Sequence, residues 1–499
     1  MKKKLFLIFT VVGFTSMSIA QTQHSAYTAI GKGVATTFLT DYQAIGINAS
    51  ALGWGTGYKG KHFTLGTTEF AFGMSSPALD KERLGNAASA LYNTIRDRDN
   101  SDFDAQKQRE AVADYAESGL TINADYNWFG ASYQSEKFGG IGVAVREKYN
   151  WYSNLNEETT DIVFRGRLSS YFDSLTIAIG GDTSVIANSS NLSEDTLSAV
   201  IRGTVNDPLS LSEITEGSEI KFSWNREYNI GYGRKIFGDD STFALYGGIG
   251  ARYIQSVAMF DLESNEDGLS MRSAVSPFYD IDYGEIGLSN PTSIKENAGL
   301  LPQASGTGYG FDLAASVILL KNIKIAAAVN NIGSITYNRN VYSVRDTLVG
   351  SMTLPGLADY DITDAMGQLL QEGSILTLVS EEEHVVTNPA TFRLGGSIEF
   401  FDKLDVGVDI VAPFNKSTPG SLQNAVVAVG GDFKPLDWLH LSAGYFGGGV
   451  YSHNIPVGVN FVLGDGAYEF GISSRDALSF FLKDSKSLSG AFGFARVRF

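Results

Sequence analysis

The sequence predicts an all-β fold, an antiparallel transmembrane β-barrel of about 14 strands with an N-terminal plug and long loops at one end. Three observations lead to this prediction. Apolar residues alternate with other residues in long runs, short and long connections alternate between the runs, and the chain ends on phenylalanine. Alternating segments of about ten residues that are joined in this way are typical of outer-membrane barrels.

The composition fits a folded chain and excludes several functions. Of the 499 residues, 55 are glycine and none is cysteine, and the formal net charge is −17. The negative charge argues against a nucleic-acid partner, because such proteins need basic patches that displace counterions from phosphate. A chain without cysteine has no disulfide, no thiolate metal site and no lipidated N-terminal cysteine.

Residues 1–20 are predicted to be a cleavable signal peptide. Three lysines at positions 2–4 precede an apolar stretch, and small residues at positions 18 and 20 suit cleavage before residue 21. Cleavage removes three lysines and no acid, so the net charge becomes −20. No later stretch is long and apolar enough for a transmembrane helix. The expected location is therefore the cell outer membrane, crossed by strands.

The alternation is clearest in the second half of the chain. Over residues 391–400, Leu394 and Ile398 share one face, and Arg393 and Glu399 share the other. The same pattern resumes after three residues, which predicts an antiparallel hairpin. A secreted array of sheets would also alternate, but the chain has little evidence of domain linkers. Fourteen strands are predicted at residues 62–75, 119–134, 138–153, 217–235, 241–262, 306–320, 322–339, 388–400, 404–414, 423–434, 437–447, 454–463, 466–474 and 488–499, and residues 269–281 could supply a further strand.

The connections between the predicted strands are asymmetric. Six are short turns, and the long ones are expected to be extracellular loops at about residues 76–118, 154–216, 263–305 and 340–387. Short turns at one end and long loops at the other are typical of outer-membrane barrels, and an even strand count places both termini at the short-turn end. Helices are expected inside the loops, at residues 82–95, 105–116 and 359–371.

The row opposite the apolar row is expected to face the lumen, because the apolar row of a transmembrane barrel faces lipid. Its charged members give five lumen candidates: Arg393, Glu399, Asp405, Asp409 and His440. For any one of them, an ion pair that stabilises the barrel is the simpler interpretation, and a role in transport is the alternative. The row also contains many glycines and alanines, which leave room for a plug or a narrow passage.

Residues 21–61 precede the first strand, are rich in glycine and show no simple period, so we expect them to fold into the barrel as a plug. The run GVATTFLTDYQAIGINASALG at residues 33–53 resembles the N-terminal hatch of the FadL/PorV-like outer-membrane proteins. That hatch typically carries an acidic residue and then Asn-Pro-Ala-x-Leu. Asp41, Asn48 and Leu52 fit this pattern and are the candidate hatch residues, whereas Ala49 and Ser50 stand where the family has proline and alanine.

The resemblance implies a 14-stranded barrel over residues 62–499 that is closed by an N-terminal plug. It also implies one of two functions. Family members either admit hydrophobic or amphipathic small molecules passively or, in the PorV branch, act as scaffolds or shuttles for secreted proteins. The expected partners are accordingly the lipid bilayer and either a hydrophobic small molecule or a secreted or membrane protein, with no nucleic acid.

No catalytic constellation is predicted. His440 and Ser442 share a face and Asp432 could lie on the next strand, so a hydrolase triad can be drawn. Polar lumen residues occur in every barrel, however, and this triad is the weaker interpretation. The histidines show no metal-ligand spacing, and residues 381–383 beside His384 are better explained as a solvated acidic loop than as a cation site. We therefore expect no enzyme activity, cofactor or metal.

Overall fold

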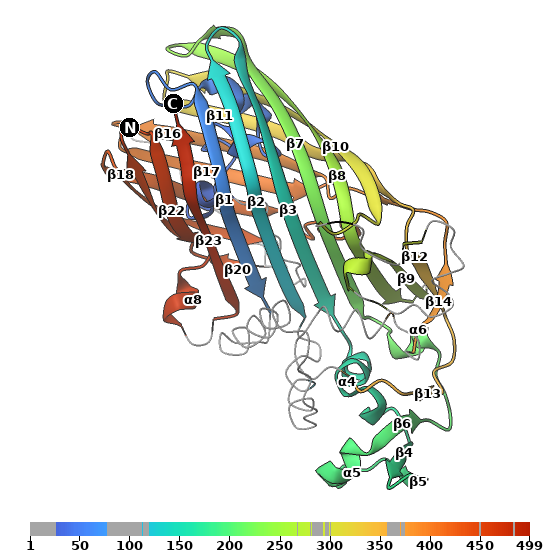
Figure 1. The fold of residues 1–499 in the computed structure, drawn as a ribbon. Coiled ribbons are helices and arrows are strands. Elements are labelled where there is room, and N and C mark those ends of the chain that lie inside the picture. The colour runs from blue at the N-terminus through green and yellow to red at the C-terminus, as the bar shows by residue number, and fades with distance from the viewer. Residues whose placement is uncertain are drawn as a thin grey trace, which may run out of the picture.

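The protein folds into a closed antiparallel barrel, in which the first strand pairs with the last along its whole length (Figure 1). The computed structural model describes residues 26–76, 112, 119–266, 268–279, 281, 293–294, 299, 301–356, 370, 375–448, 451–482 and 485–499. The predicted signal peptide therefore lies outside the described residues. So do the three predicted loop helices, apart from Val112 and Leu370.

The barrel wall has fourteen strand positions, which confirms the predicted fold class and count. In chain order they are β1 (Phe63–Ser75), β2 (Leu120–Ser135), β3 (Gly139–Asn154), β7 (Glu219–Asp239), β8 (Phe243–Asn265), β10 (Gly306–Leu319), β11 (Ile323–Tyr337), β15 with β16 (His384–Thr387, Thr391–Phe400), β17 (Leu404–Pro413), β18 (Val426–Leu436), β19 (Leu439–Gly448), β20 with β21 (Tyr451–Asn454, Val457–Leu463), β22 (Tyr468–Ser474) and β23 (Ser487–Arg498).

The two faces of the wall differ as the alternation predicts. On β10, Tyr309, Phe311 and Leu313 are 60%, 58% and 61% exposed, while the residues between them are buried. This outward row continues to Leu319, ten residues beyond Tyr309. At about 3.3 Å per residue and a tilt of about 40°, the row is roughly 25 Å high, which matches the apolar band of outer-membrane barrels. The exposed face is therefore the lipid-facing face.

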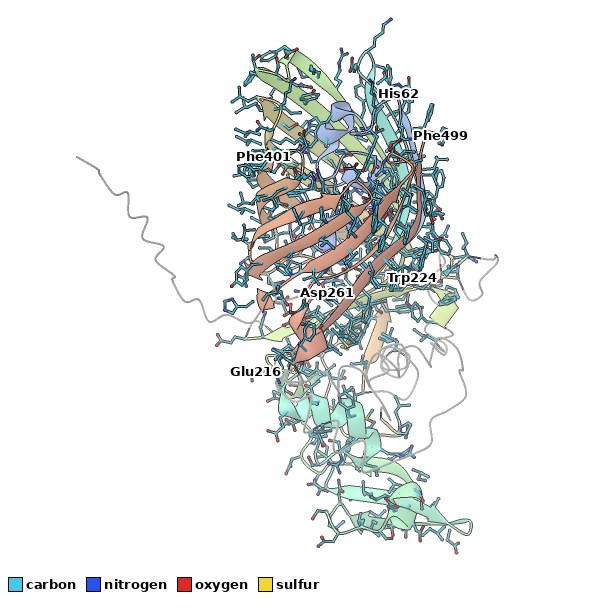
Figure 2. The ribbon with its side chains drawn as sticks, turned by 90° about the vertical axis from the view of Figure 1, so that its left-hand side faces the viewer. His62, Glu216, Trp224, Asp261, Phe401 and Phe499 are labelled. Carbon is cyan, nitrogen blue, oxygen red and sulfur yellow. The ribbon has the colours of Figure 1, made fainter. Side chains whose placement is uncertain are left out.

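Aromatic side chains mark both edges of this band. Toward the long loops, the rings of Tyr228, Tyr253 and Tyr309 follow one another across three strands, with centroids 6.2 and 5.4 Å apart. At the other edge, the C-terminal Phe499 stacks on Phe63 with centroids 5.5 Å apart, where Figure 2 shows His62, Phe401 and Phe499 near one end. Such girdles are expected where a barrel meets the two membrane interfaces.

Six short turns join the strands at one end, here called the short-turn end, and both β1 and β23 meet there. At two of these turns, Leu320 and Lys321 have φ of +53° and +69°, and Phe401 and Asp402 have φ of +53° and +56°. Two successive residues with positive φ are typical of tight hairpin turns, because their twist matches that of the flanking strands. The short turns that the sequence predicts are thus confirmed.

The opposite end, here called the long-loop end, extends well beyond the wall (Figure 1). β8 continues into β9 (Gly268–Val275), which is the further strand expected within residues 269–281. It pairs with β8 and β12 outside the barrel and adds nothing to the fourteen positions. The remaining elements of this end are β12 (Val341–Arg345), β14 (Thr377–Ser380), α4 (Glu157–Arg165), η3 (Gly166–Leu168), α5 (Glu194–Ser198), α6 (Leu211–Ile214), η4 (Pro277–Tyr279) and α8 (Leu478–Phe481).

A separate four-stranded sheet lies at this end, in the order β13 (Ser351–Met352), β6 (Val200–Thr204), β4 (Ser174–Ile179) and β5 (Asp182–Ala187). The sequence predicts only loops in these stretches. The strands have two to six residues, which is too short for alternation to distinguish them from irregular chain. Among the described residues, no helix is both long and apolar enough to cross a membrane.

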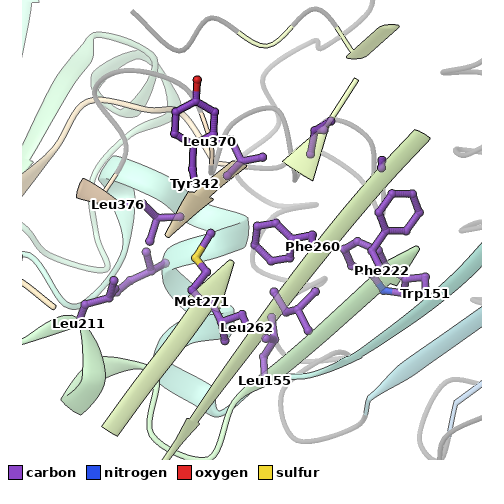
Figure 3. Close-up of a cluster of buried hydrophobic side chains, with 14 of the residues drawn as sticks. Trp151, Leu155, Leu211, Phe222, Phe260, Leu262, Met271, Tyr342, Leu370 and Leu376 are labelled. Atoms are coloured by element: carbon purple, nitrogen blue, oxygen red, sulfur yellow. The ribbon is translucent and has the colours of Figure 1, made fainter. Parts of the chain in front are cut away.

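The structure corrects the expected environment of one apolar row on β7. Ile220, Phe222 and Trp224 share a face with the lipid-exposed Tyr228 and Ile230, yet they are buried in a hydrophobic cluster. Figure 3 shows this cluster, in which Phe222 lies near Trp151 and Phe260. These strands continue past the membrane band, and segments of the long-loop end cover their outer face in place of lipid.

Candidate functional site

The N-terminal segment, defined here as residues 26–61, lies inside the barrel (Figure 2). Its first helix, α1 (Tyr27–Ile30), contacts β21, β22 and β23. The next, η1 (Tyr42–Ala44), contacts β2 and β3, and η2 (Ala49–Trp54) contacts β7, β8 and β10. Since these strands lie on different sides of the wall, the segment crosses the lumen.

A buried ion network attaches the segment to the last two strands. Asp41 Oδ2 accepts hydrogen bonds from the Arg496 guanidinium, with an Nε distance of 3.0 Å. Arg496 Nη1 also donates to Glu469 Oε2 at 3.0 Å, and Arg498 pairs with the same carboxylate. All four side chains are at most 7% exposed. Two carboxylates therefore neutralise two guanidinium groups in a place shielded from water.

A second set of hydrogen bonds centres on Glu69 of β1. Tyr42 Oη donates to Glu69 Oε1 at 2.5 Å, and Gln43 Nε2 donates to the same oxygen at 2.7 Å. The other oxygen, Oε2, accepts from Asn127 Nδ2 at 3.0 Å. Three donors thus solvate a carboxylate that is itself buried, as a buried charge requires. Two of these donors belong to the N-terminal segment.

The rest of the wall binds mainly the backbone of the segment. Asp409 Oδ2 accepts from the amides of Ala35 and Thr36, at 2.7 and 3.0 Å, and from the Thr36 hydroxyl at 3.0 Å. Arg146 donates to the carbonyl oxygens of Tyr42 and Ile45 at 3.1 and 3.0 Å. The backbone of this irregular segment thus forms its hydrogen bonds with polar side chains of the wall instead of with a helix or a sheet.

Glycines in the wall let the segment come this close. A Cβ atom on Gly66 or Gly130 would overlap the ring of Tyr42, and a Cβ on Gly430 would overlap the carbonyl of Lys32. At Gly395, a Cβ would lie 2.6 Å from that of Thr36. The small lumen residues that the sequence shows are thus partly explained by direct contact with the N-terminal segment.

Replacing Gly130 with alanine is expected to displace Tyr42 and loosen the segment. Forcing a methyl group into a packed site typically costs about 1–3 kcal/mol. A single cysteine at Ser50, which is fully buried in a chain without other cysteines, should then react with maleimide faster by about 5- to 100-fold. Gly490→Ala is the matched control, because no atom lies within 4 Å of its added Cβ. Equal labelling of both variants would contradict the close contact.

A cavity lies beside the N-terminal segment at Gly46 and is partly open to solvent. Gly420 and Leu422, from the connection between β17 and β18, line its other side. The lining is mostly polar or charged, and it comprises Gly46, Lys148, Asn150, Asn225, Glu227, Arg252, Ile254, Asn330, Asn331, Ile335, Asn388, Pro389, Thr391, Arg393, Gly420 and Leu422. We take this cavity and the adjacent N-terminal segment as the candidate functional site.

Three charged groups of the lining, Lys148, Glu227 and Arg252, are paired with one another or with Asp312 just behind the lining. Arg252 Nη2 donates to both carboxylate oxygens of Asp312, at 2.7 and 2.8 Å. Lys148 Nζ lies 3.2 Å from Glu227 Oε2, and Arg252 Nη1 lies 3.4 Å from the same oxygen. The charges of Lys148 and Arg252 are therefore compensated by acids of the protein before any ligand enters.

One side of the cavity is apolar. Ile254 and Ile335 line it and belong to a buried cluster with Met259 and Tyr337 of the wall and Val341 of β12. Leu422 adds a further apolar side chain to the lining. The cavity thus combines a polar wall with an apolar one, an arrangement that suits a molecule with both kinds of surface.

The three hatch candidates all lie in the N-terminal segment but not in the cavity lining. Asp41 belongs to the ion network described above. Asn48 Nδ2 donates to the Thr36 carbonyl at 2.8 Å, and its Oδ1 accepts from Ser50 Oγ at 2.5 Å, so it ties two parts of the segment together. Leu52 is fully buried, and its carbonyl accepts from Gln134 Nε2 at 2.8 Å.

The five lumen candidates do not gather at one site. Arg393 lines the cavity, and Asp409 holds the backbone of the segment. Nearer the short-turn end, Asp405 lies 2.9 Å from Lys434 Nζ, and Glu399 is half-buried. His440 Nδ1 lies 3.3 Å from Asp432 Oδ2.

The proposed hydrolase triad is only partly assembled. Asp432 is paired with Ser442 across the sheet and lies beside His440, but it also binds Lys32 Nζ at 3.3 Å. Within the described part of the chain, no hydrogen bond joins His440 to Ser442. The expected aspartate–histidine contact is present, and the contact that would activate a serine is not.

Several cavity residues were not among the sequence candidates. Asn225 and Glu227 alternate with Tyr228 and Ile230 on β7, so the same period-two rule that selects the lipid face also marks them as inward. Asn388 carries no such signal, because it lies in the break between β15 and β16. Its place in the cavity depends on the tertiary structure.

Comparison with solved structures finds several channels at low sequence identity. The toluene transporter TodX of Pseudomonas putida matches with 11% identity and a TM-score of 0.39, covering 97% of this chain and 99% of its own. A FadL homologue of Pseudomonas aeruginosa matches with 11% identity and a TM-score of 0.39, covering 97% of each chain. No curated protein matches.

A family model gives the assignment of the chain. It covers residues 174–466, which is more than half of the sequence, and its description is "Family of unknown function (DUF5723)". The matched range runs from the small external sheet to the turn before β22, so it includes most of the barrel wall. The chain belongs to the DUF5723 family.

Proposed function

We propose that this protein is a passive outer-membrane channel for hydrophobic or amphipathic small molecules, and that residues 21–61 are its plug. Residues 1–20 would direct export and be removed, and the short-turn end would face the periplasm. The observation that carries the proposal is an N-terminal segment that fills the lumen beside a cavity with one polar and one apolar side.

The contacts between the segment and the wall support a plug that can move. They include many hydrogen bonds and ion pairs, such as those of Asp409 and Arg146, which water can replace. Apolar contacts with the wall add to them: Val34 packs against Phe446, and Leu52 packs against Ala144. In this proposal Asp41, Asn48 and Leu52 hold the plug, and Arg393 contributes to the cavity.

The mixed lining of the cavity favours an amphipathic solute over a pure hydrocarbon. Apolar surface of the solute would contact Ile254, Ile335 and Leu422, while its polar group would face the asparagines and charged residues. A pure hydrocarbon would displace water from the polar groups of the wall and could not form hydrogen bonds in its place, which is unfavourable. Transport would be non-enzymatic and would need no cofactor.

A disulfide between the plug and the wall is expected to block uptake. Ser50 Oγ lies 2.7 Å from Ser316 Oγ of β10, so cysteines at these positions are close enough to be bridged with little backbone movement. The oxidised Ser50→Cys/Ser316→Cys protein, in vesicles with lipopolysaccharide in the outer leaflet, should lose uptake of propyl β-glucoside and hexanoate by at least tenfold. Reduction should restore it.

The control is Ser474→Cys/Ser489→Cys, whose hydroxyl oxygens lie 3.2 Å apart on β22 and β23. This bridge joins two wall strands and leaves the plug free, so oxidation should not change uptake. If the Ser50–Ser316 bridge also leaves uptake of both probes unchanged, the channel proposal fails. The scaffold function for secreted proteins would then be the better interpretation.

A further inference from the structure

Among the residues that the structure describes, three buried amide oxygens in the cavity have no hydrogen-bond partner. They are Oδ1 of Asn225, Asn330 and Asn388, and the last two residues are only 3% and 1% exposed. Buried polar atoms are nearly always satisfied, so three free acceptors around one cavity call for an explanation.

The orientation of two of these amides follows from their nitrogen atoms. Asn330 Nδ2 donates to the Ile47 carbonyl at 3.1 Å, and Asn388 Nδ2 donates to the Tyr309 carbonyl at 2.9 Å. Turning either amide over would place an oxygen against a carbonyl oxygen, which is repulsive. The acceptor atoms are therefore left for whatever occupies the cavity.

The charges around the cavity narrow the choice of ligand. Lys148, Arg252 and Arg393 would repel an ammonium group, although such a group could donate to the free oxygens. Two of these cations are paired with acids, Arg252 with Asp312 and Lys148 with Glu227, and Arg393 lies in the field of Asp409 and Asp312. Cations that are already paired with acids would attract an anion only weakly. An anion would also place its own lone pairs against three amide oxygens that need hydrogen-bond donors.

A neutral group that both donates and accepts fits this set of atoms. In the described part of the chain, Arg252 Nε is buried without an acceptor, so the cavity also offers a free donor. A hydroxyl group has one donor and two acceptor sites, and several hydroxyls can serve the three asparagines and Arg252 together. Ile254, Ile335 and Leu422 remain for a short hydrocarbon part of the ligand.

We propose that the cavity selects a neutral, polyhydroxylated amphiphile, such as an alkyl glycoside or a polyol with a short apolar tail. This inference rests on the proposed channel function and names its substrate class. The probe for the test is propyl β-glucoside, with hexanoate as the anionic comparison. Both are titrated against the protein in lipid nanodiscs, which avoids competition from detergent, and saturation-transfer NMR gives the dissociation constants.

The wild type should bind propyl β-glucoside at least tenfold more tightly than hexanoate. Asn225→Leu should weaken glucoside binding about five- to tenfold, because leucine has a similar volume but lacks the hydrogen-bond acceptor of the asparagine side chain. The Asn225 side chain makes no hydrogen bond to the described residues, so the substitution disturbs little else. Asn225→Asp keeps an acceptor and should stay within about threefold of the wild type.

The matched control is Asn229→Leu, four residues further along the inward row of β7. Its side-chain oxygen and nitrogen are also buried and have no partner among the described residues, but Asn229 does not line the cavity. Binding should be unchanged in this variant. Equal losses in Asn225→Leu and Asn229→Leu, or equal binding of the two probes, would overturn the assignment, as would a cavity that binds neither.

The uptake assay separates this inference from the proposed function. Suppose that the plug disulfide blocks uptake of hexanoate, but the protein does not bind the glucoside preferentially. This result would support the channel function and contradict only the proposed substrate class. Uptake of neither probe would contradict the channel. Heat-modifiable electrophoretic mobility of every variant shows that a loss of binding does not come from an unfolded barrel.

Discussion

Replacing Asp41 with alanine is expected to release the N-terminal segment from the wall. The variant leaves Arg496 and Arg498 to share the single carboxylate of Glu469 in a place shielded from water. Removing one partner of a buried ion pair typically costs about 3–5 kcal/mol. With a single cysteine at Ser50 as reporter, the rate of maleimide labelling should therefore rise by roughly 100-fold or more. The measurement is the labelling rate of the folded protein in nanodiscs.

Asp405→Ala provides the matched control for this experiment. Asp405 pairs with Lys434 at 2.9 Å near the short-turn end, and the two side chains are 20% and 24% exposed. Pairs with access to water contribute about 0–1 kcal/mol, so labelling should change by less than about fivefold. A similar increase in both variants would show general loosening of the barrel and would contradict a specific role for Asp41.

Deleting residues 21–60 while keeping the signal peptide is expected to give a folded, permanently open barrel. The wall closes through backbone pairing of β1 with β23, and this pairing does not involve the segment. Removing the segment exposes inward charges such as Glu69 and Asp409, which water can then hydrate. Single-channel conductance in planar bilayers should rise from a closed baseline to a sustained open level.

Excision of β4–β6 is a suitable control, because it removes structure of the long-loop end without touching the lumen. Ser174 and Thr204 are paired neighbours in the small sheet, so a short turn can join the chain after residues 175–203 are removed. This variant should keep the closed baseline. If the plug deletion also stays closed, although its electrophoretic mobility shows a folded barrel, the segment is not what closes the lumen.

The barrel was largely predictable because the signal for it is local. On β10 and β16, every second residue reports whether it faces lipid or the interior, and a bilayer makes the difference between the two environments large. The turns at Leu320 and Phe401 were visible for the same reason, since they interrupt the alternation within a few residues. The five lumen candidates were chosen by the same rule.

The cavity was less predictable because its parts come from distant segments. Gly46, Arg252 and Asn388 lie far apart in the sequence, and only the closed barrel brings them to one cavity. Of the candidate residues, Arg393 alone lines it. The small external sheet was not foreseen either, because its short strands carry too few residues for a period to be recognised.

By itself, the sequence determined that apolar residues alternate with other residues in long runs, which are joined by short turns at one end. It also determined that a glycine-rich stretch precedes these runs. The tertiary structure decided what that stretch does to the lumen. The contact between Asp41 and Arg496 joins residues near opposite ends of the chain, and so does the packing of Tyr27 against Gly493. Such pairings leave no local pattern, because closure of the barrel, and not sequence spacing, brings the two side chains together.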